Sequence, residues 1–295
     1  MRKLSNITNI EYTMIKANNT IFQFYLAMLD SFGQYLSDRY PNSCSLEDTK
    51  HYQTIIIEKI VRMFHTLELL TKNTLDEVSS RCLLRGILDS ITTYCFIYQR
   101  IDKDDILFRH YLYALDGWRE YNKSVLRITE KNESHVNEEI LCNHVIKQIE
   151  DRLYHHSFYT KNCSSVEKII KNASWNYESL QKPHSVKYGQ MYSFVGFDTS
   201  LIAYFQSYLS QFAHGLHFSN KNTDYEELKK VMHESIILAD KFIQAITQTF
   251  HNKELINHFL NSDSFQTFLS SKDFNLDNLA ECASKLVRKD KTLLI

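Results

Sequence analysis

The sequence predicts an all-α protein, a multi-helix bundle of about eight to ten helices. The chain of 295 residues contains only 6 Gly and 2 Pro, where average usage gives roughly 20 and about 15. Tight turns between strands depend on these two residues, so their scarcity disfavours a sheet. Apolar residues recur at intervals of three and four along most of the chain, which is the helical period.

Composition excludes several classes of function. The formal net charge is -1, which argues against nucleic-acid binding through a broadly basic surface but leaves a local groove open. The sequence contains no Gly-rich phosphate loop and no CxxC pair, so we expect no nucleotide loop, no zinc knuckle and no cofactor. It has no apolar signal core and no run of 18 apolar residues, so we expect a cytoplasmic protein without a membrane span.

The first half of the chain contains five predicted helices, which cover residues 7–38, 49–72, 75–100, 105–130 and 134–157. Tyr40-Pro41 ends the first, because the residue before proline is disfavoured in helical geometry. Asp48 or Thr49 is expected to cap the second and Asp104 the fourth. On the fifth, the apolar spacing points five side chains inward: Val136, Ile140, Val145, Ile149 and Leu153.

In the second half, a short helix near 164–173 precedes an irregular, aromatic-rich stretch over 174–197. Asp198 is expected to cap a helix over 199–218, and Asp224, with Glu227 as a capping box, a helix over 225–251. Three short helices follow, at 254–260, 264–270 and 276–288. The predicted organisation is therefore a main bundle, residues 1–251, and a C-terminal appendage of short helices, residues 252–295.

The helix over 199–218 carries one polar stripe and one apolar stripe. Ser207, Ser210, His214 and His217 share one face at helical spacing. The opposite face is predicted to be core: Ile202, Phe205, Leu209, Phe212, Ala213 and Leu216. No carboxylate joins the two histidines on their stripe, so we predict no metal. The stripe is then either a hydrogen-bonded seam between helices or a catalytic or ligand-contacting face.

A second polar set lies on the helix over 75–100, where Arg81, Arg85 and Asp89 stand four residues apart. On an exposed helix, Arg85 and Asp89 would form only a weak ion pair. The apolar flanks instead indicate a central helix, in which an arginine needs partners. Asp89 is one partner, and a phosphate or the Ser/His stripe is another. An arginine beside a histidine suits phosphodiester chemistry, in which the guanidinium stabilises charge while the imidazole moves a proton.

Two motifs carry a resemblance to a known family. The run Arg85-Gly86-Ile87-Leu88-Asp89, followed far downstream by Leu209-Ser210 and His214, resembles the DUF5677 group of bacterial helical proteins, which is related to HEPN-like domains. Asp89 stands where that family has Glu, and Gln206 occupies its tyrosine position. The HEPN signature of arginine four to six residues before histidine is absent. Either an arginine of the 75–100 helix replaces it in space, or nuclease activity is absent.

The resemblance implies a HEPN-like core and a metal-independent endoribonuclease or RNA-binding factor of stress or phage defence, acting as a homodimer. In that hypothesis His214 is the general acid or base, Arg85 binds phosphate and Ser210 orients the substrate or His214. The substrate-binding residues it implies are Arg81, Asp89 and His217. The alternative is a non-catalytic helical module that binds a partner protein or small ligand, with the Arg/Asp/Ser/His set as a buried structural network. An Arg85–His214 pair in one open cleft favours the first, and sealed side chains favour the second.

Overall fold

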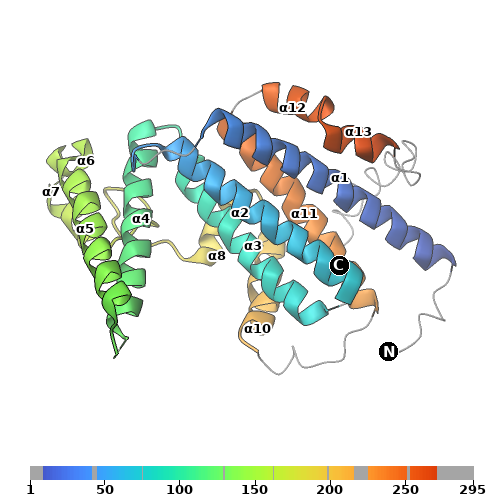
Figure 1. Cartoon of the computed structure of the whole chain (residues 1–295), viewed down its shortest axis with the longest axis horizontal. Helices are drawn as coiled ribbons and strands as arrows, with labels where there is room; N and C mark the ends of the chain where they lie inside the picture. The colour runs from blue at the N-terminus through green and yellow to red at the C-terminus, as the bar shows by residue number, and fades with distance from the viewer. Residues whose placement is uncertain are drawn as a thin grey trace. The chain divides into compact units, whose positions relative to one another are not determined.

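The computed structural model describes residues 9–41, 45–74, 76–128, 130–161, 163–197, 199–215, 225–250 and 253–270 (Figure 1). These residues form helices and no β-strand; one isolated bridge joins Tyr177 and Ser185. The predicted all-α class is confirmed. Across the same ranges, no helix is both long and apolar enough to span a membrane.

The described residues form more helices than the eight to ten expected, because the predicted 199–218 helix is divided and two short helices, Ser157–Lys161 and Tyr188–Met191, form outside the predicted ones. The larger helices are α1 Asn9–Arg39, α2 Thr49–Leu69, α3 Glu77–Tyr98, α4 Lys103–Leu126, α5 Glu133–His155 and α11 Tyr225–Phe250. The shorter ones are α6 Ser157–Lys161, α7 Cys163–Lys171, α8 Tyr188–Met191, α9 Thr199–Tyr204, α10 Ser210–Ala213, α12 Lys253–Leu260 and α13 Asp263–Ser270. Two π-helical turns, η1 Leu70–Thr74 and η3 Phe205–Leu209, and one 3-10 turn, η2 Tyr192–Val195, complete the described elements.

Helix starts follow the chemistry of their caps. Asp48 Oδ1 accepts from the His51 N–H at 3.0 Å, as expected for the cap of α2. Asp102, rather than the expected Asp104, caps α4 by accepting from the Asp104 N–H at 2.9 Å. Both residues are aspartates two positions apart, so composition alone did not distinguish them. Asp224, the expected cap of α11, and Asp198 lie outside the described residues.

The chain forms two compact units. Unit 1 comprises residues 1–42, 54–92 and 192–295, and unit 2 comprises residues 43–53 and 93–191. The division between 92 and 93 falls inside α3. This organisation differs from the expected main bundle 1–251 with a separate appendage 252–295.

In unit 1, α1 packs against α2, α11, α12 and α13. Phe22 of α1 meets Phe64 of α2 edge to face, with ring centroids 6.3 Å apart. Phe24, also on α1, contacts Phe259 of α12 at 5.6 Å and Phe268 of α13 at 5.5 Å. Helices α12 and α13 therefore lie over α1 within unit 1 instead of forming an appendage (Figure 1).

Helix α3 is central, as its apolar flanks predicted. Leu84, Ile87, Leu88 and Ile91 have no exposed surface. The methyl group of Met63 on α2 would lie 3.0 Å from a Cβ added at Gly86, so the absence of a side chain there permits close packing of the two helices. Any polar side chain on the remaining face of α3 must find its partners within the protein.

In unit 2, α4 and α5 form a helical hairpin, with Arg119 bonded to Glu150 at 2.6 Å. Ile149 and Leu153 are fully buried on α5, as predicted. The prediction is wrong for Val136 and Ile140, which are 44% and 62% exposed. Ile140 and Ile149 are nine residues apart, and nine steps of 100° place them on opposite faces of the helix.

A buried arginine holds the irregular stretch after α7 in place through hydrogen bonds to its backbone. Arg109 of α4 donates through Nη1 to the carbonyl oxygens of Trp175 at 3.1 Å and Tyr177 at 2.9 Å. Its guanidinium lies over the Tyr177 ring, 3.7 Å from the centroid. Trp175 Nε1 also donates to Asp116 at 3.2 Å. The backbone of this stretch therefore has partners although it forms neither helix nor strand.

The buried His110 links Leu46, near the start of unit 2, to Tyr98 through hydrogen bonds. His110 Nε2 donates to the Leu46 carbonyl at 3.1 Å, while Nδ1 accepts from the Tyr98 hydroxyl at 3.0 Å. This pattern requires the neutral imidazole. Burial lowers the pKa of His110 to about 4.

Candidate functional site

The predicted Ser/His helix does not run unbroken. The structure divides residues 199–213 into α9, the π-turn η3 and α10, and His214 follows as the C-terminal cap. Gly215 has φ +61°, a left-handed conformation that ends helices and that glycine adopts at little cost. The helix therefore stops short of the expected residue 218.

The π-turn changes which side chains face inward. Phe205, Leu209 and Phe212 are buried, as predicted, whereas Ala213 is exposed. A π-turn bonds residues five apart, so side chains on either side of it no longer follow one α-helical stripe. Ile202 and Leu216 lie outside the residues whose side chains are described.

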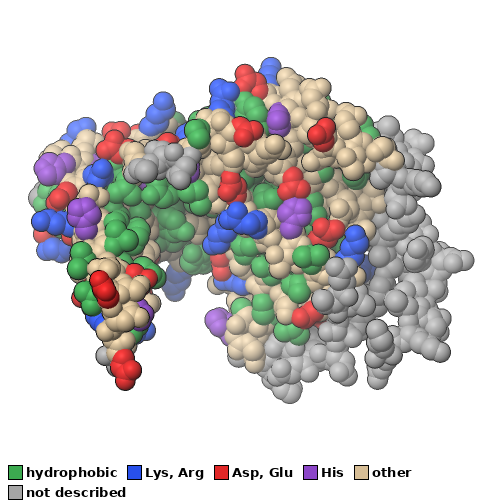
Figure 2. Space-filling model, viewed as in Figure 1, with side chains coloured by type: hydrophobic (Ala, Val, Ile, Leu, Met, Phe, Trp, Pro, Cys, Tyr) green, Lys and Arg blue, Asp and Glu red, His purple; other side chains and the backbone are tan. Residues whose placement is uncertain are grey.

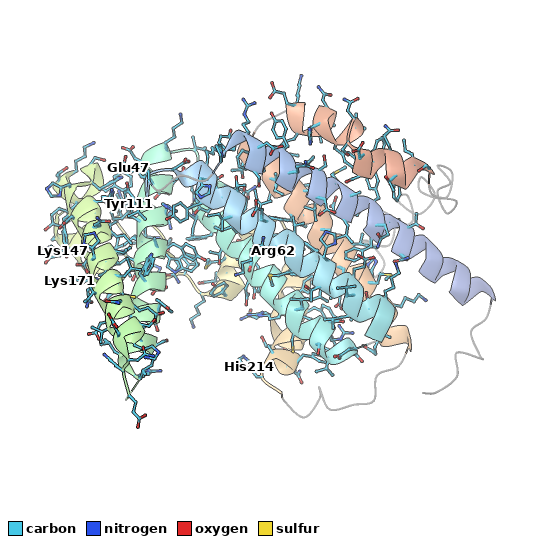
Figure 3. All side chains as sticks on the ribbon, viewed as in Figure 1. Glu47, Arg62, Tyr111, Lys147, Lys171 and His214 are labelled. Carbon is cyan, nitrogen blue, oxygen red and sulfur yellow. The ribbon has the colours of Figure 1, made fainter. Side chains whose placement is uncertain are left out.

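The polar stripe is likewise divided. His214 is exposed at the end of α10, where Figure 3 labels it, and its backbone N–H donates to the Ser210 carbonyl at 3.1 Å. Ser210 is half-buried and Ser207 is exposed. His217 lies outside the described residues.

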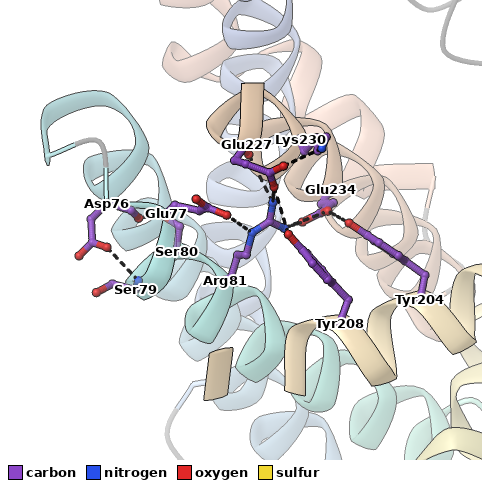
Figure 4. A network of polar contacts seen from close by, with 10 residues as sticks. All are labelled: Asp76, Glu77, Ser79, Ser80, Arg81, Tyr204, Tyr208, Glu227, Lys230 and Glu234. Atoms are coloured by element: carbon purple, nitrogen blue, oxygen red, sulfur yellow. Dashed lines mark hydrogen bonds and ion pairs between the residues drawn. The ribbon is translucent and has the colours of Figure 1, made fainter. Parts of the chain in front are cut away.

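Arg81 is at the centre of a network of polar contacts that joins α3, α11 and the segment 199–213 (Figure 4). Its side chain has 0% exposed surface, and each guanidinium nitrogen donates to a carboxylate. Nε bonds Glu77 at 2.9 Å, Nη1 bonds Glu234 at 2.9 Å and Nη2 bonds Glu227 at 2.7 Å. All the groups involved belong to unit 1. Arg81 is therefore satisfied by the protein itself and has no surface open to a substrate.

Two tyrosines from the interrupted helix complete the network. Tyr204 donates to Glu234 at 2.7 Å, and Tyr208 donates to Glu227 at 3.1 Å. Their rings stack with centroids 5.0 Å apart, and the Arg81 guanidinium carbon lies 4.6 Å from the Tyr208 ring centroid. The segment 199–213 thus meets α3 at Arg81, but through its aromatic side chains and not through its Ser/His stripe.

The carboxylates of this network differ in protonation behaviour. Burial raises the pKa of Glu234, although Arg81 opposes that shift. Burial also acts on Glu227, but hydrogen bonds from Lys230 and Tyr208 outweigh it and lower its pKa to about 2. In the hydrogen bonds around Glu234, both carboxylate oxygens accept from donors, which is the pattern of an ionised group. The network is therefore a charged assembly of one buried arginine and three carboxylates.

Arg85 lies one helical turn further along α3 and is held differently. Its Nε pairs with Asp89 Oδ2 at 3.1 Å, and the Tyr192 hydroxyl donates to Asp89 Oδ1 at 3.0 Å. The guanidinium carbon lies 5.6 Å from the centroid of the Tyr192 ring. The Arg85 side chain is 17% exposed. Burial raises the pKa of Asp89, and the positive charge of Arg85 opposes that shift.

The structure brings together Arg85 and Asp89, as the spacing predicted. None of the described contacts joins His214 or Ser210 to Arg81, Arg85 or Asp89. The nitrogen donors of Arg81 go instead to three carboxylates that were not among its predicted partners: Glu77, Glu227 and Glu234. Two signals were present, since Glu77 lies four residues before Arg81 and Glu227 and Glu234 share a face of one predicted helix.

Comparison with known proteins yields no match, whether against family models, curated proteins or solved structures. The DUF5677 and HEPN-like resemblance therefore stays a prediction that rests on its two motifs. Within the described ranges, no group of three or more His, Cys, Asp or Glu side chains is arranged to hold a metal ion.

Proposed function

We propose that the chain is a non-catalytic helical binding module and that the Arg81 network is structural. The observation that carries this proposal is the complete enclosure of Arg81. A catalytic guanidinium must reach the charge that develops on the substrate, whereas all three nitrogens of Arg81 are occupied by carboxylates of the same unit.

The surroundings of His214 support the same proposal. A general acid or base must lie within hydrogen-bond reach of the reacting group and beside the residues that stabilise charge. His214 is exposed, and its described contacts include neither Arg81 nor Arg85.

Surface charge also favours a module over a ribonuclease. On the face visible in Figure 2, Lys and Arg side chains are interspersed with Asp and Glu among the coloured residues. Binding to an RNA backbone depends on several cations gathered along its path. The neighbouring carboxylates would weaken binding of this face to an RNA backbone.

The test is incubation of the purified protein with end-labelled single-stranded and hairpin RNA, beside the His214→Ala variant. The module proposal expects the same intact RNA with both proteins. Cleavage by the natural protein that disappears in His214→Ala would overturn the proposal and favour the HEPN-like endoribonuclease. Equal cleavage by both would point to a contaminating nuclease, which a mock purification from cells lacking the protein identifies.

A further inference from the structure

Two arginines on one face of α3 have opposite hydrogen-bond status. Arg81 has a carboxylate on every nitrogen. Arg85, four residues later, has its Nε on Asp89, while its Nη1 is buried and has no hydrogen-bond partner among the described residues. A buried donor left without an acceptor costs about 1–3 kcal/mol, and more for a charged group. The structure therefore contains an unsatisfied cationic donor next to a satisfied one.

The position of Arg85 is set by its neighbours. Asp89 accepts from Arg85 Nε and from the Tyr192 hydroxyl through different oxygens, so one carboxylate fixes both side chains. The Tyr192 ring lies near the guanidinium, with its centroid 5.6 Å from Cζ. A donor whose orientation is already fixed loses little conformational entropy when a ligand binds.

Access to Arg85 is from its partly exposed edge. The side chains of Arg85 and Asp89 are 17% and 33% exposed. A ligand that approaches this edge meets a guanidinium whose Nε stays on Asp89 and whose Nη1 has no acceptor among the described residues.

We propose that Arg85 binds the carboxylate group of a ligand. A guanidinium presents parallel N–H donors that match the two oxygens of a planar carboxylate. Asp89 already balances the positive charge of Arg85, so attraction depends on directed hydrogen bonds more than on net charge. A singly charged carboxylate is repelled by Asp89 less than a doubly charged phosphate. The inference extends the proposed function, since it names the ligand class of the module.

The direct test follows the Arg85 Nε–H resonance in a nitrogen–proton NMR spectrum, assigned by its absence in Arg85→Lys. Acetate and benzoate are titrated at constant ionic strength, with inorganic phosphate and a short single-stranded RNA as separate arms. We expect a saturable shift with both carboxylates in the millimolar range, which corresponds to about -4 kcal/mol. Phosphate and RNA should leave the resonance in place.

Arg62→Met is the matched control, because Arg62 also has a carboxylate partner, Glu58 at 3.7 Å, but lies on the exposed surface of α2. Calorimetric titration of the variants with benzoate should show binding to Arg62→Met and none to Arg85→Met. Tyr192→Phe keeps the ring and should bind more weakly, since Asp89 loses the Tyr192 hydrogen bond.

No shift with either carboxylate, or equal binding by Arg85→Met, would overturn the inference while leaving the RNA result untouched. A larger shift with phosphate or RNA would also overturn it and would identify the ligand as a phosphate. Circular dichroism of Arg85→Met and Arg85→Lys separates lost binding from lost folding, and a folded Arg85→Lys variant with undiminished affinity would contradict the role of the guanidinium fork.

Discussion

At the residue scale, Arg81 shows how an interior charge is accommodated. It has no exposed side-chain surface and three carboxylate partners. The sequence indicated that an arginine on this helix needed partners, because its flanks are apolar. It did not indicate which carboxylates supply them, since Glu227 and Glu234 are about 150 residues away and meet Arg81 only in the folded chain.

Arg81→Met removes the countercharge of buried Glu77 and Glu234. Breaking a buried ion pair from one side costs about 3–5 kcal/mol, so we expect a fall of that size in the free energy of unfolding, measured by urea denaturation at pH 7. The pair between Arg85 and Asp89 is partly exposed. Arg85→Met should therefore lower the free energy of unfolding by about 1 kcal/mol or less.

The Arg81→Met deficit should depend on pH. Without the guanidinium, burial holds the folded-state pKa of the Glu234 carboxyl above its unfolded value, so protonation of Glu234 stabilises the fold as the pH falls. The difference between Arg81→Met and the natural protein should therefore narrow from pH 7 to pH 4. A constant difference across this range would mean that packing, rather than charge, accounts for the loss.

The lowered pKa of His110 should make the free energy of unfolding decrease as the pH falls. Burial lowers its folded-state pKa to about 4, below the ordinary histidine value of 6.5. Because the folded state resists protonation, the stability is fully present above pH 6.5 and declines as the pH falls to about 4. The lowered pKa of His110 corresponds to a loss of about 3 kcal/mol in the free energy of unfolding over this pH range. Unfolding midpoints of the natural protein and His110→Gln, measured at several pH values, should converge as the pH falls; parallel curves would exclude His110 as the cause.

At the element scale, apolar periodicity predicted the long helices well and their ends less well. Helices α1 to α5 and α11 lie within a few residues of their expected ranges. The π-turn in 205–209 was not predictable from spacing, because residues such as Phe205 and Leu209 fit an α-helix equally well. Gly215, by contrast, was a visible stop signal inside the expected helix.

Gly215→Ala tests this helix end. Gly215 has φ +61°, and an alanine in that conformation should lower the free energy of unfolding by about 1 kcal/mol. Gly33→Ala is the opposite control: Gly33 lies inside α1, and a Cβ there has nothing within 4 Å. It should raise stability by up to about 1 kcal/mol. Equal effects of the two substitutions would mean that backbone conformation at Gly215 does not limit the fold.

Two alanine substitutions on α5 test which face of the helix is buried. Ile149 is fully buried and Ile140 is 62% exposed. Ile149→Ala should therefore cost about 2–5 kcal/mol, and Ile140→Ala about 0.5 kcal/mol or less. Thermal unfolding of both variants measures the two losses of stability. A larger loss for Ile140→Ala than for Ile149→Ala would mean that the buried face of α5 includes Ile140, as the sequence predicted.

At the scale of the whole molecule, sequence order and spatial grouping differ. Unit 2 takes residues 43–53 and 93–191, while unit 1 takes the chain on either side. The expected boundary at 251/252 followed the change from long to short helices. It could not anticipate that Phe259 and Phe268 pack on Phe24, near the other end of the chain.

Hydrogen exchange should reveal the two units. Arg81→Met should speed amide exchange in residues 77–92, 199–213 and 225–250 of unit 1 and leave 133–170 of unit 2 unchanged. Arg109→Met, which releases two backbone carbonyls in unit 2, should do the reverse. Mass spectrometry of peptides distinguishes this outcome from uniform acceleration by both variants, which would show a single cooperative unit.

The hydrogen bonds from Arg109 to the Trp175 and Tyr177 carbonyls also limit where residues can be inserted into this chain. Two carbonyls held by one guanidinium fix the spacing of the residues between them, so an extra amino acid inserted at Asn176 would displace one acceptor. Pro183 lies between the backbone pairs Ser179–Lys182 and Glu178–His184, so a tag or loop inserted beside it lengthens the turn without displacing either pair. Lack of regular secondary structure therefore does not identify the places where this chain tolerates lengthening.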